Sequence, residues 1–198
     1  EIMLQQTRVE SVFGYFERFM ARFPTPSHVA RAPVEEILDA WAGLGYYARA
    51  RNLHHACCEI EQMYEGKVPS DPDDFGRLKG VGDYTRGAVM SIAFNRAEPI
   101  VDGNVERVFA RLFLVDENVR LTPTKKRLWA LAREWVSGLA PEHKPGDANQ
   151  ALMELGALVC LPKAPKCEQC PVQKHCAAFE SNRVHELPVK SKPAPKKT

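Results

Sequence analysis

The sequence predicts an all-α fold. Apolar residues recur at three- and four-residue spacings through most of the chain, which is the period of amphipathic helices. No segment shows sustained alternation of period two, and the one strand-like run, residues 99–101, is too short to make a sheet. Of the 198 residues, 44% are hydrophobic and 26% are charged, so the composition excludes a disordered tail and a fibre.

Proline and glycine delimit the helices expected in the first part of the chain. The apolar stripe of the first helix stops before Pro24, and the second helix follows Pro33, because proline is favourable at a helix start. A glycine turn at residues 43–45 ends the second helix, and Gly66 ends the third. These helices are expected over residues 4–20, 34–41, 47–64 and, as one short turn of helix, 72–78.

Residues that cap helix ends mark the later helices. Asp102 and Asn104 offer caps for one helix, and Thr122 or Thr124 begins another. Asp147 is placed to cap the last long helix. The helices expected here cover about residues 84–94, 103–113, 122–136 and 148–160.

Basic charge gathers near the end of the chain. The net charge is +2, and residues 181–198 hold five basic side chains and one acid. A segment of this kind is typical of a solvated linker or tail, which would also help to hold a polyanion. No apolar run approaches the roughly 18 residues of a membrane helix, and no charged-then-apolar leader occurs at the start. We therefore expect a soluble intracellular protein without a membrane partner, and the amphipathic pattern at Glu1 indicates a fragment or processed form.

Four of the six cysteines crowd into one short segment and predict a metal centre. Thiolates gathered this closely need a compensating metal, either a 4Fe–4S cluster or a single zinc ion. Zinc sites of this size commonly use two CxxC pairs, whereas only one is present, which favours the cluster. The predicted ligands are Cys160, Cys167, Cys170 and Cys176. Cys57 and Cys58 are adjacent, cannot join distant elements, and are expected to be ordinary helix residues.

A glycine-rich turn separates two of the predicted helices. Gly80 and Gly82 flank Val81 and allow a sharp turn that points backbone N–H groups outward before the next helix. Such a turn favours an anion, so a phosphate seat is one interpretation and a plain interhelical turn is the other.

Several segments together resemble one family. The chain resembles the helix-hairpin-helix DNA glycosylases, and within them the MutY-type adenine DNA glycosylases, over nearly its whole length before the tail. The motifs are residues 1–7 (EIMLQQT), 43–49 (GLGYYAR), 78–85 (LKGVGDYT), 101–108 (VDGNVERV) and 149–156 (NQALMELG), with the four clustered cysteines. The resemblance implies a helical barrel with the hairpin over residues 1–113, a 4Fe–4S cluster domain over 114–180 and a basic linker or tail over 181–198.

The resemblance also implies a two-carboxylate reaction. Glu1 would protonate adenine, and Asp102 would stabilise the cationic sugar, with Tyr84 and Asn104 in support. If Glu1 is buried beside the apolar stripe, its pKa would be raised, as a proton donor requires. Asp102 alone could also be read as a plain helix cap. Endonuclease III enzymes carry a catalytic lysine where this chain has Tyr84, which implies base removal without strand cleavage.

The implied partner is double-stranded DNA with adenine opposite 8-oxoguanine or guanine, bound by a monomer. In the resemblance Gln6 and Tyr46 are wedges, Thr7 and Leu44 lie against the opposite base, and Gln150 with Glu154 reads the adenine edge. The implied DNA contacts are completed by Arg49, Gly80, Val81 and Gly82, with a monovalent cation at the hairpin. A cytoplasmic, nucleoid-associated bacterial protein is expected, with a nuclear or mitochondrial one as the alternative.

Two other functions stay open at this point. One is an endonuclease III-like lyase for oxidised pyrimidines, which Tyr84 and the Gln5-Gln6-Thr7 run oppose. The other is a non-catalytic, DNA-binding iron–sulfur module, which the presence of both Glu1 and Asp102 opposes.

The chain departs from the family pattern at Lys79, where proline is usual, and at Ala148, where an aromatic residue is common.

Overall fold

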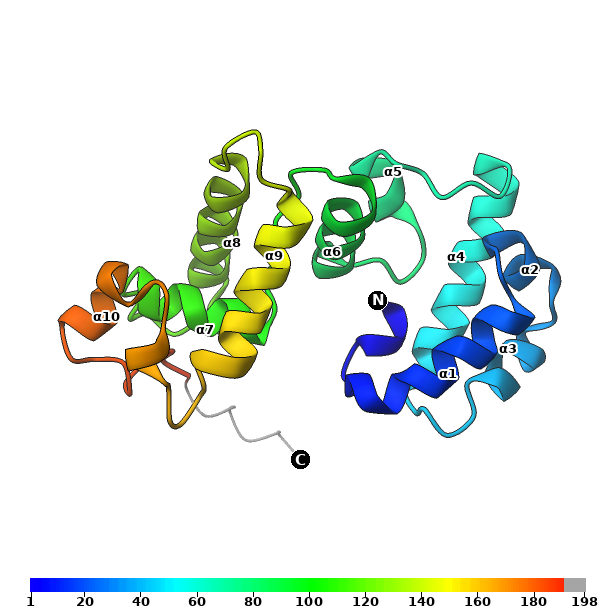
Figure 1. Cartoon of the computed structure of the whole chain (residues 1–198). Coiled ribbons are helices and arrows are strands. Elements are labelled where there is room, and N and C mark those ends of the chain that lie inside the picture. Colours follow the sequence, from blue (N-terminus) through cyan, green and yellow to red (C-terminus); the bar gives the residue numbers. More distant parts are fainter. Residues whose placement is uncertain (191–198) are drawn as a thin grey trace, which may run out of the picture. The chain divides into compact units, whose positions relative to one another are not determined.

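The computed structural model describes residues 1–190, and within them every regular element is helical (Figure 1). The all-α prediction is confirmed. The α-helices are α1 (Val9–Arg22), α2 (Pro26–Arg31), α3 (Val34–Ala40), α4 (Ala48–Tyr64), α5 (Pro72–Arg77), α6 (Asp83–Phe94), α7 (Gly103–Leu112), α8 (Thr122–Ser137), α9 (Pro145–Glu154) and α10 (Ala177–Glu180). Short 3-10 turns are η1 (Ile2–Leu4), η3 (Cys167–Gln169) and η4 (Gln173–His175), and η2 (Leu155–Val159) is a π-helix that follows α9 directly.

The start of the chain differs from the predicted helix over residues 4–20. The first residues form the separate turn η1, and α1 begins only at Val9. Gln6 has a φ of 57°, in the left-handed region, where a right-handed helix cannot continue. Helix α2 was not predicted, although Thr25 caps it and Pro26 occupies its first position.

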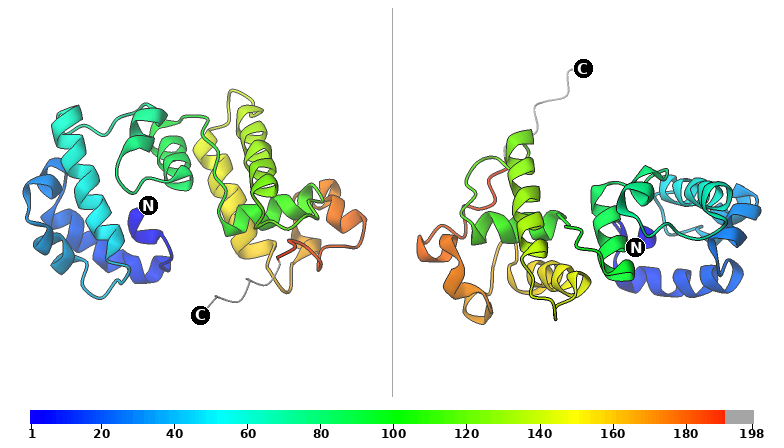
Figure 2. Two further views of the ribbon diagram at one scale, coloured as in Figure 1. Left: turned by 180° about the vertical axis from the view of Figure 1, so that it is seen from behind. Right: turned by 90° about the horizontal axis from the view of Figure 1, so that it is seen from above.

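The first compact unit comprises Glu1–Met90. Helix α4 packs against α2 and α3 and contacts η1, and its place beside them is visible in Figures 1 and 2. Ile37 and Trp41 are fully buried at the centre of this unit. Burial of such large side chains is the main favourable term in its folding.

The second compact unit begins at Ser91, within α6. Helix α7 is its centre, because α8, α9, η2 and α10 all contact it (Figure 2). This places the division before α7, whereas the predicted boundary lies between residues 113 and 114. The apolar face of α7, which includes Val105 and Phe109, is buried against these later elements, so α7 belongs with them.

Residues 181–190 are part of the second unit, which corrects the prediction of a tail from residue 181. Val184 and Leu187 are buried against Ala178. Arg183 donates to Asp116 at 3.1 Å and to Glu186 at 2.7 Å, so much of its charge is balanced locally. The rest of the predicted tail, residues 191–198, lies outside the described residues.

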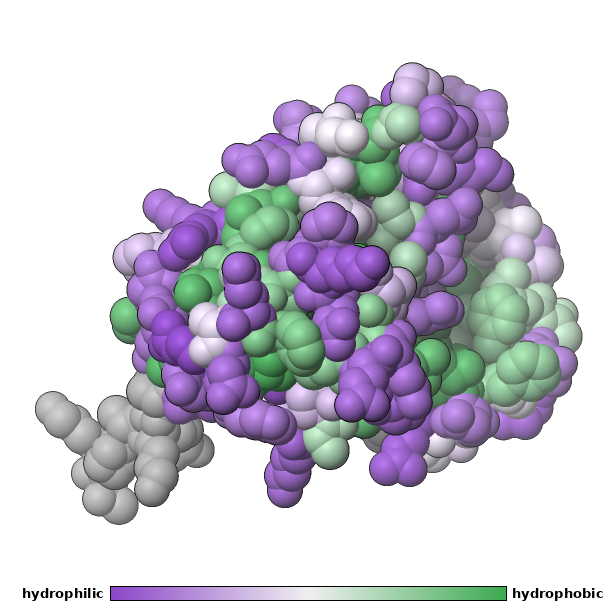
Figure 3. Space-filling view, turned by 60° about the vertical axis from the view of Figure 1, so that its left-hand side comes forward, coloured by the Kyte–Doolittle hydropathy of each residue, from purple (hydrophilic) through white to green (hydrophobic). Residues whose placement is uncertain are grey.

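The face seen in Figure 3 is largely hydrophilic, with hydrophobic residues gathered into patches between hydrophilic ones. Among the described residues no helix is both long and apolar enough to cross a membrane.

We expect Leu128→Ala to lower the free energy of unfolding by about 2–5 kcal/mol, because it leaves a cavity in a closely packed core. Leu128 is 0% exposed in α8. Leu121 precedes the same helix but is 53% exposed, so Leu121→Ala is a matched control with an expected cost below about 1 kcal/mol. Urea denaturation followed by circular dichroism measures both. Equal losses in the two variants would contradict the assigned core.

Candidate catalytic site and cysteine centre

Asp102 holds the start of α7. Its Oδ1 accepts hydrogen bonds from the backbone N–H groups of Asn104 at 2.9 Å and Val105 at 2.7 Å. Its Oδ2 accepts a third bond from Nδ2 of Asn104 at 3.0 Å. The carboxylate is half-buried and lies at the positive end of the helix. Asp102 is therefore the N-cap of α7, as the sequence allowed. The same hydrogen bonds hold its carboxylate in one orientation.

Arg107 joins this helix start to the cysteine segment. Its Nη2 donates to Oδ1 of Asn104 at 2.9 Å and to the carbonyl of Gly156 at 2.7 Å. Its Nε donates to the carbonyl of Cys160 at 2.6 Å. Burial lowers the pKa of Arg107, and the nearby Cys160 opposes that shift. Asp102, Asn104, Arg107 and Cys160 thus form one continuous hydrogen-bonded chain of residues.

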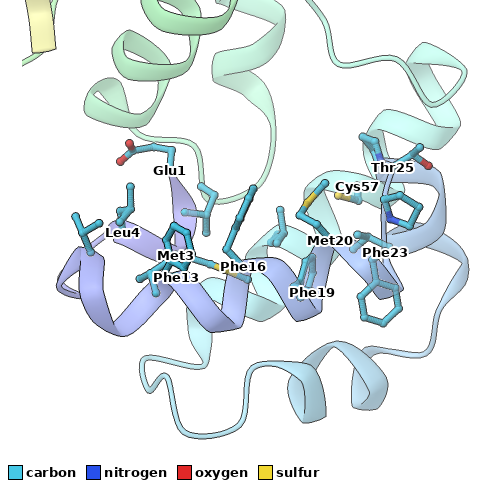
Figure 4. A pocket seen from close by; sticks show the side chains of 17 residues that line it. Glu1, Met3, Leu4, Phe13, Phe16, Phe19, Met20, Phe23, Thr25 and Cys57 are labelled. Atoms are coloured by element: carbon cyan, nitrogen blue, oxygen red, sulfur yellow. The ribbon is translucent and has the colours of Figure 1, made fainter.

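Glu1 is exposed, so it is not buried beside the apolar stripe as the sequence allowed. It stands at one end of an apolar groove of about 540 Å³, beside Leu4, while Phe23 and Cys57 lie at the other end (Figure 4). Phe13 and Phe16 of α1 line the groove and are 66% and 53% exposed. Glu1 belongs to the first compact unit and Asp102 to the second.

Two predicted DNA-contacting loops lie in the first unit. Gln6 and Tyr46 are both exposed, with φ values of 57° and 50°. Leu44 is only 7% exposed and belongs to the core, which does not agree with its expected place against a base. Arg49 is half-buried, and its guanidinium donates to the backbone carbonyls of Ile2, Met3 and Gln5 and to the Thr7 hydroxyl.

The glycine turn lies between α5 and α6, as predicted. Gly80 has a φ of 81°, and a Cβ there would meet the Asn52 side chain at 2.6 Å, so only glycine fits. The N–H of Val81 donates to the carbonyl of Leu78 at 3.1 Å, which closes the turn. Gly82 is exposed, and Tyr84 is half-buried in the first turn of α6. The phosphate seat and the monovalent cation at this turn stay predictions.

Helix α9 presents the two residues that were expected to read adenine. Gln150 and Glu154 are both exposed and four residues apart, so they share a helix face. Gln150 donates through Nε2 to the carbonyl of Gly146 at 3.2 Å. Their neighbour Asn149, which was not singled out, is 1% exposed and donates to Oγ of Ser91 and to the carbonyl of Glu98, both at 2.9 Å. A polar residue on the core-facing side of an amphipathic helix is the signal that would have identified it.

The four clustered cysteines line one cavity in the second unit. Burial and the neighbouring thiols raise the pKa of Cys167, and burial raises that of Cys170. A metal that binds the deprotonated thiolates would overcome these shifts, so the donor set fits a metal centre. Within residues 1–190 no three His, Cys, Asp or Glu side chains converge on the position of a single ion.

Arg111 supplies positive charge beside these thiols and was not predicted as a site residue. It is 2% exposed, and its Nη1 donates to Sγ of Cys160 at 3.3 Å and to the carbonyl of Leu161 at 2.8 Å. Its Nε donates to the carbonyl of Leu187 at 3.0 Å. Arg107 and Arg111 lie four residues apart on the otherwise apolar face of α7, which is a signal that the sequence contains.

Comparison with known proteins identifies the superfamily of the chain. Residues 1–137 match the profile of the HhH-GPD superfamily base excision DNA repair proteins. The chain belongs to this superfamily.

Within the superfamily, the chain is similar to curated adenine DNA glycosylases. The chain is 40% identical over 186 residues to an adenine DNA glycosylase of Schizosaccharomyces pombe and 43% identical over 188 residues to one of Homo sapiens. It is 36% identical over 192 residues to an adenine DNA glycosylase of Buchnera aphidicola. The matches cover 93%, 94% and 97% of this chain but 40%, 34% and 54% of the relatives, so the chain spans about a third to a half of their length.

Solved structures agree on the fold. A thermostable thymine-DNA glycosylase aligns with a TM-score of 0.79 at 32% identity, over 91% of this chain and 81% of that one. A trapped endonuclease III–DNA covalent intermediate aligns with a TM-score of 0.72 at 26% identity, over 91% and 82%. These similarities confirm the helix-hairpin-helix glycosylase fold that was expected from the motifs.

Cys57 should be inert in the folded protein, in contrast to an exposed thiol. Burial raises the pKa of the Cys57 thiol to about 12, so little of the reactive thiolate is present at pH 8. We expect iodoacetamide to label Cys57 slowly in buffer and rapidly in urea, as measured by mass spectrometry of the peptides. The half-buried Cys58 is the internal comparison. Equal labelling of Cys57 in buffer and in urea would show that α4 does not bury it.

Proposed function

We propose that this chain is the catalytic part of a monofunctional adenine DNA glycosylase. It removes adenine mispaired with 8-oxoguanine or guanine from double-stranded DNA and leaves an abasic site. The observation that carries the proposal is Asp102, a carboxylate fixed by three N–H donors at the start of α7. Three full-length relatives that match more than nine tenths of the chain bear the name adenine DNA glycosylase, which supports the same activity.

The reaction uses the two carboxyl groups in different ways. The target adenine leaves the base stack first, because its sugar bond is not accessible inside the duplex. Glu1, protonated, donates its proton to N7 of adenine, and the electron pair of the C1′–N9 bond leaves with the base. Asp102, as a fixed carboxylate, stabilises the positive sugar that results. Water then adds at C1′ and releases a proton, which completes the hydrolysis.

The face of α9 fits base recognition. Gln150 offers an amide and Glu154 a carboxylate, and together they can donate to and accept from the edge of a flipped adenine. Both are exposed, so contact with a base does not require the core to open.

Tyr84 supports hydrolysis over strand cleavage. A lyase forms a Schiff base between an amine and C1′ of the sugar, and a phenol cannot form one. Lys79 lies before the glycine turn, outside α6, where its N–H donates to Oε2 of Glu59 at 2.8 Å. The position from which an amine would act in an endonuclease III-like enzyme is therefore occupied by Tyr84.

A 4Fe–4S cluster on the four cysteines is part of the proposal. The thiols of Cys160, Cys167, Cys170 and Cys176, which line one cavity, would hold such a cluster. The buried Arg111 offers a positive charge to the net negative charge of four thiolates and the cluster. When bound, the cluster would hold the loops of residues 160–176 together.

The activity is tested by single-turnover release of adenine from a duplex with one adenine opposite 8-oxoguanine. We expect strand breaks only after alkali, and a rate about 10²–10³-fold lower in Asp102→Asn because the sugar cation loses its stabilising charge. Asparagine keeps an acceptor for the α7 cap, so this variant should stay folded and bind DNA. Glu1→Gln should lower the rate about 10²–10⁴-fold.

Two results would contradict the proposed activity. Strand breaks without alkali, together with trapping of the protein on DNA by borohydride, would identify a lyase. Duplex binding without base release by the folded wild-type protein in its full-length form would identify a non-catalytic DNA-binding module. Circular dichroism of each variant provides the control for folding.

The metal content is tested on protein purified without oxygen. We expect about four iron and four sulfide per chain and a broad absorption band in the visible region. Both should be lost in Cys167→Ser, because one ligand of the cluster is missing. Cys58→Ser is the matched control, since Cys58 lies on α4 in the other compact unit and should leave the iron content unchanged. About one zinc per chain and no iron would contradict the cluster.

A further inference from the structure

Arg49 occupies an unusual position for a residue expected to contact DNA. It lies in the first turn of α4, is half-buried, and directs its guanidinium back into its own unit. Nη1 donates to the carbonyls of Ile2 at 3.0 Å and Met3 at 2.9 Å, and also to the carbonyl of Gln5. Nη2 donates to Oγ1 of Thr7 at 2.9 Å and, at 3.4 Å, to the carbonyl of Gly45. One side chain thus binds two loops that lie about forty residues apart in the sequence.

The carbonyls that Arg49 binds precede the two strained residues of these loops. Gln5 comes directly before Gln6, and Gly45 directly before Tyr46; Gln6 and Tyr46 have φ values of 57° and 50°. Left-handed backbone is unfavourable for residues other than glycine and persists only where the surroundings fix it. The guanidinium of Arg49 fixes both positions from the same point.

The ring of Tyr46 is also held by Arg49. The guanidinium carbon lies 5.3 Å from the Tyr46 ring centroid and 5.5 Å from that of the buried Trp41. A planar guanidinium can stack on rings and donate to several oxygens at once, whereas a lysine ammonium is a single compact charge. Tyr46 as a residue remains 59% exposed, although its ring contacts the Arg49 guanidinium.

The arrangement is not one that maximises stability. Nε of Arg49 is buried without a hydrogen-bond partner in the part of the chain that the structure describes, and burial lowers the pKa of the guanidinium. A side chain that binds phosphate donates its hydrogen bonds to the phosphate oxygens. The Nη donors of Arg49 are instead taken by backbone carbonyls and by the Thr7 hydroxyl of its own unit.

We propose that Arg49 is a positioning residue that fixes Gln6 and Tyr46 as one rigid, exposed pair for insertion into the DNA duplex, and that it does not bind phosphate. This inference rests on the proposed function, because it assigns to the pair a part in extracting adenine. A second bond supports the same rigidity: Nε2 of Gln5 donates to Oγ1 of the buried Thr85 in α6 at 2.8 Å. The first loop is thereby tied to the helix that follows the glycine turn.

Arg49→Lys is the decisive variant, because it keeps the charge and removes the fork of donors. We expect its single-turnover excision rate to fall at least about tenfold, as a shift of about 1 Å in a positioned group is enough for a larger loss. Arg127→Lys is the matched control, since Arg127 makes two bonds, of 2.9 and 3.0 Å, to Glu117 on the exposed surface. We expect that control to excise adenine within about twofold of the wild-type rate.

The salt dependence of DNA binding separates positioning from phosphate contact. Removing a phosphate-binding charge lowers the slope of log K against log salt by about one. We expect Arg49→Gln to leave this slope unchanged while it lowers excision as much as Arg49→Lys does. A lowered slope in Arg49→Gln, or a wild-type excision rate in Arg49→Lys, would overturn the proposal.

A double-mutant cycle with Tyr46→Ala shows whether Arg49 acts through the exposed pair. If it does, Arg49→Lys lowers the excision rate much less in the Tyr46→Ala background than in wild type. Additive losses would overturn the proposal, because they would mean that Arg49 acts elsewhere.

Hydrogen exchange of the free protein supplies a readout that needs neither activity nor DNA. We expect peptides that cover residues 1–8 and 43–47 to be protected in wild type and to exchange faster in Arg49→Lys, with the rest of the first unit unchanged. Unprotected exchange of these peptides in wild type would overturn the proposal even if no variant folds. Wild type that has protected loops but releases no adenine would count against the proposed activity and not against the fixing of the loops by Arg49.

Discussion

The second unit depends on two buried guanidinium groups on one helix. Arg107 and Arg111 place their charges on the inner face of α7 and reach carbonyls on both sides of the cysteine cavity. A buried charge without partners is costly, so both arginines require that the loop after Cys160 and the segment at Leu187 stay in place. Both arginines give the irregular backbone around them strong charge-assisted hydrogen bonds. The cap at Asp102 is attached to the same helix and is fixed by it.

Local patterns were sufficient to predict most helices and the cap at Asp102. Apolar periodicity and the glycine and proline positions identified α3 to α8 to within a few residues, because these signals act within one turn of the chain. The last predicted helix corresponds to α9 together with η2, but α9 begins at Pro145, so Asp147 lies inside the helix and does not cap it. The order of the family motifs along the chain predicted the helix-hairpin-helix glycosylase fold, which the solved structures confirm. The cysteine spacing indicated a metal centre, and the structure adds that all four thiols line one cavity.

What the sequence did not reveal depends on contacts between distant residues. Residues 181–190 have the composition of a linker, yet Arg183 finds Asp116 and Leu187 finds a buried place beside Ala178. Leu44 looked like a loop residue free to touch DNA, whereas the close packing around Trp41 takes it into the core. Arg49 looked like a basic residue for DNA. Its loop-binding role depends on residues 2–7, which no local pattern connects to α4.

Two of the six non-glycine residues with left-handed backbone in residues 1–190, Gln6 and Tyr46, directly follow residues whose carbonyls bind the same side chain, Arg49. Gln6, Tyr46 and the buried Nε of Arg49 each cost conformational or solvation energy, and all three are found in one small region of the first unit. Exposed side chains on strained backbone are poor choices for a fold that only has to persist, because glycine would relieve the strain at both positions. Their presence is explained if a glycosylase needs side chains that enter the duplex without first becoming ordered, since ordering them at that moment would weaken binding. The same reasoning applies to Asp102, because its three donors fix the carboxylate in the position from which, in the proposed reaction, it would stabilise the sugar cation.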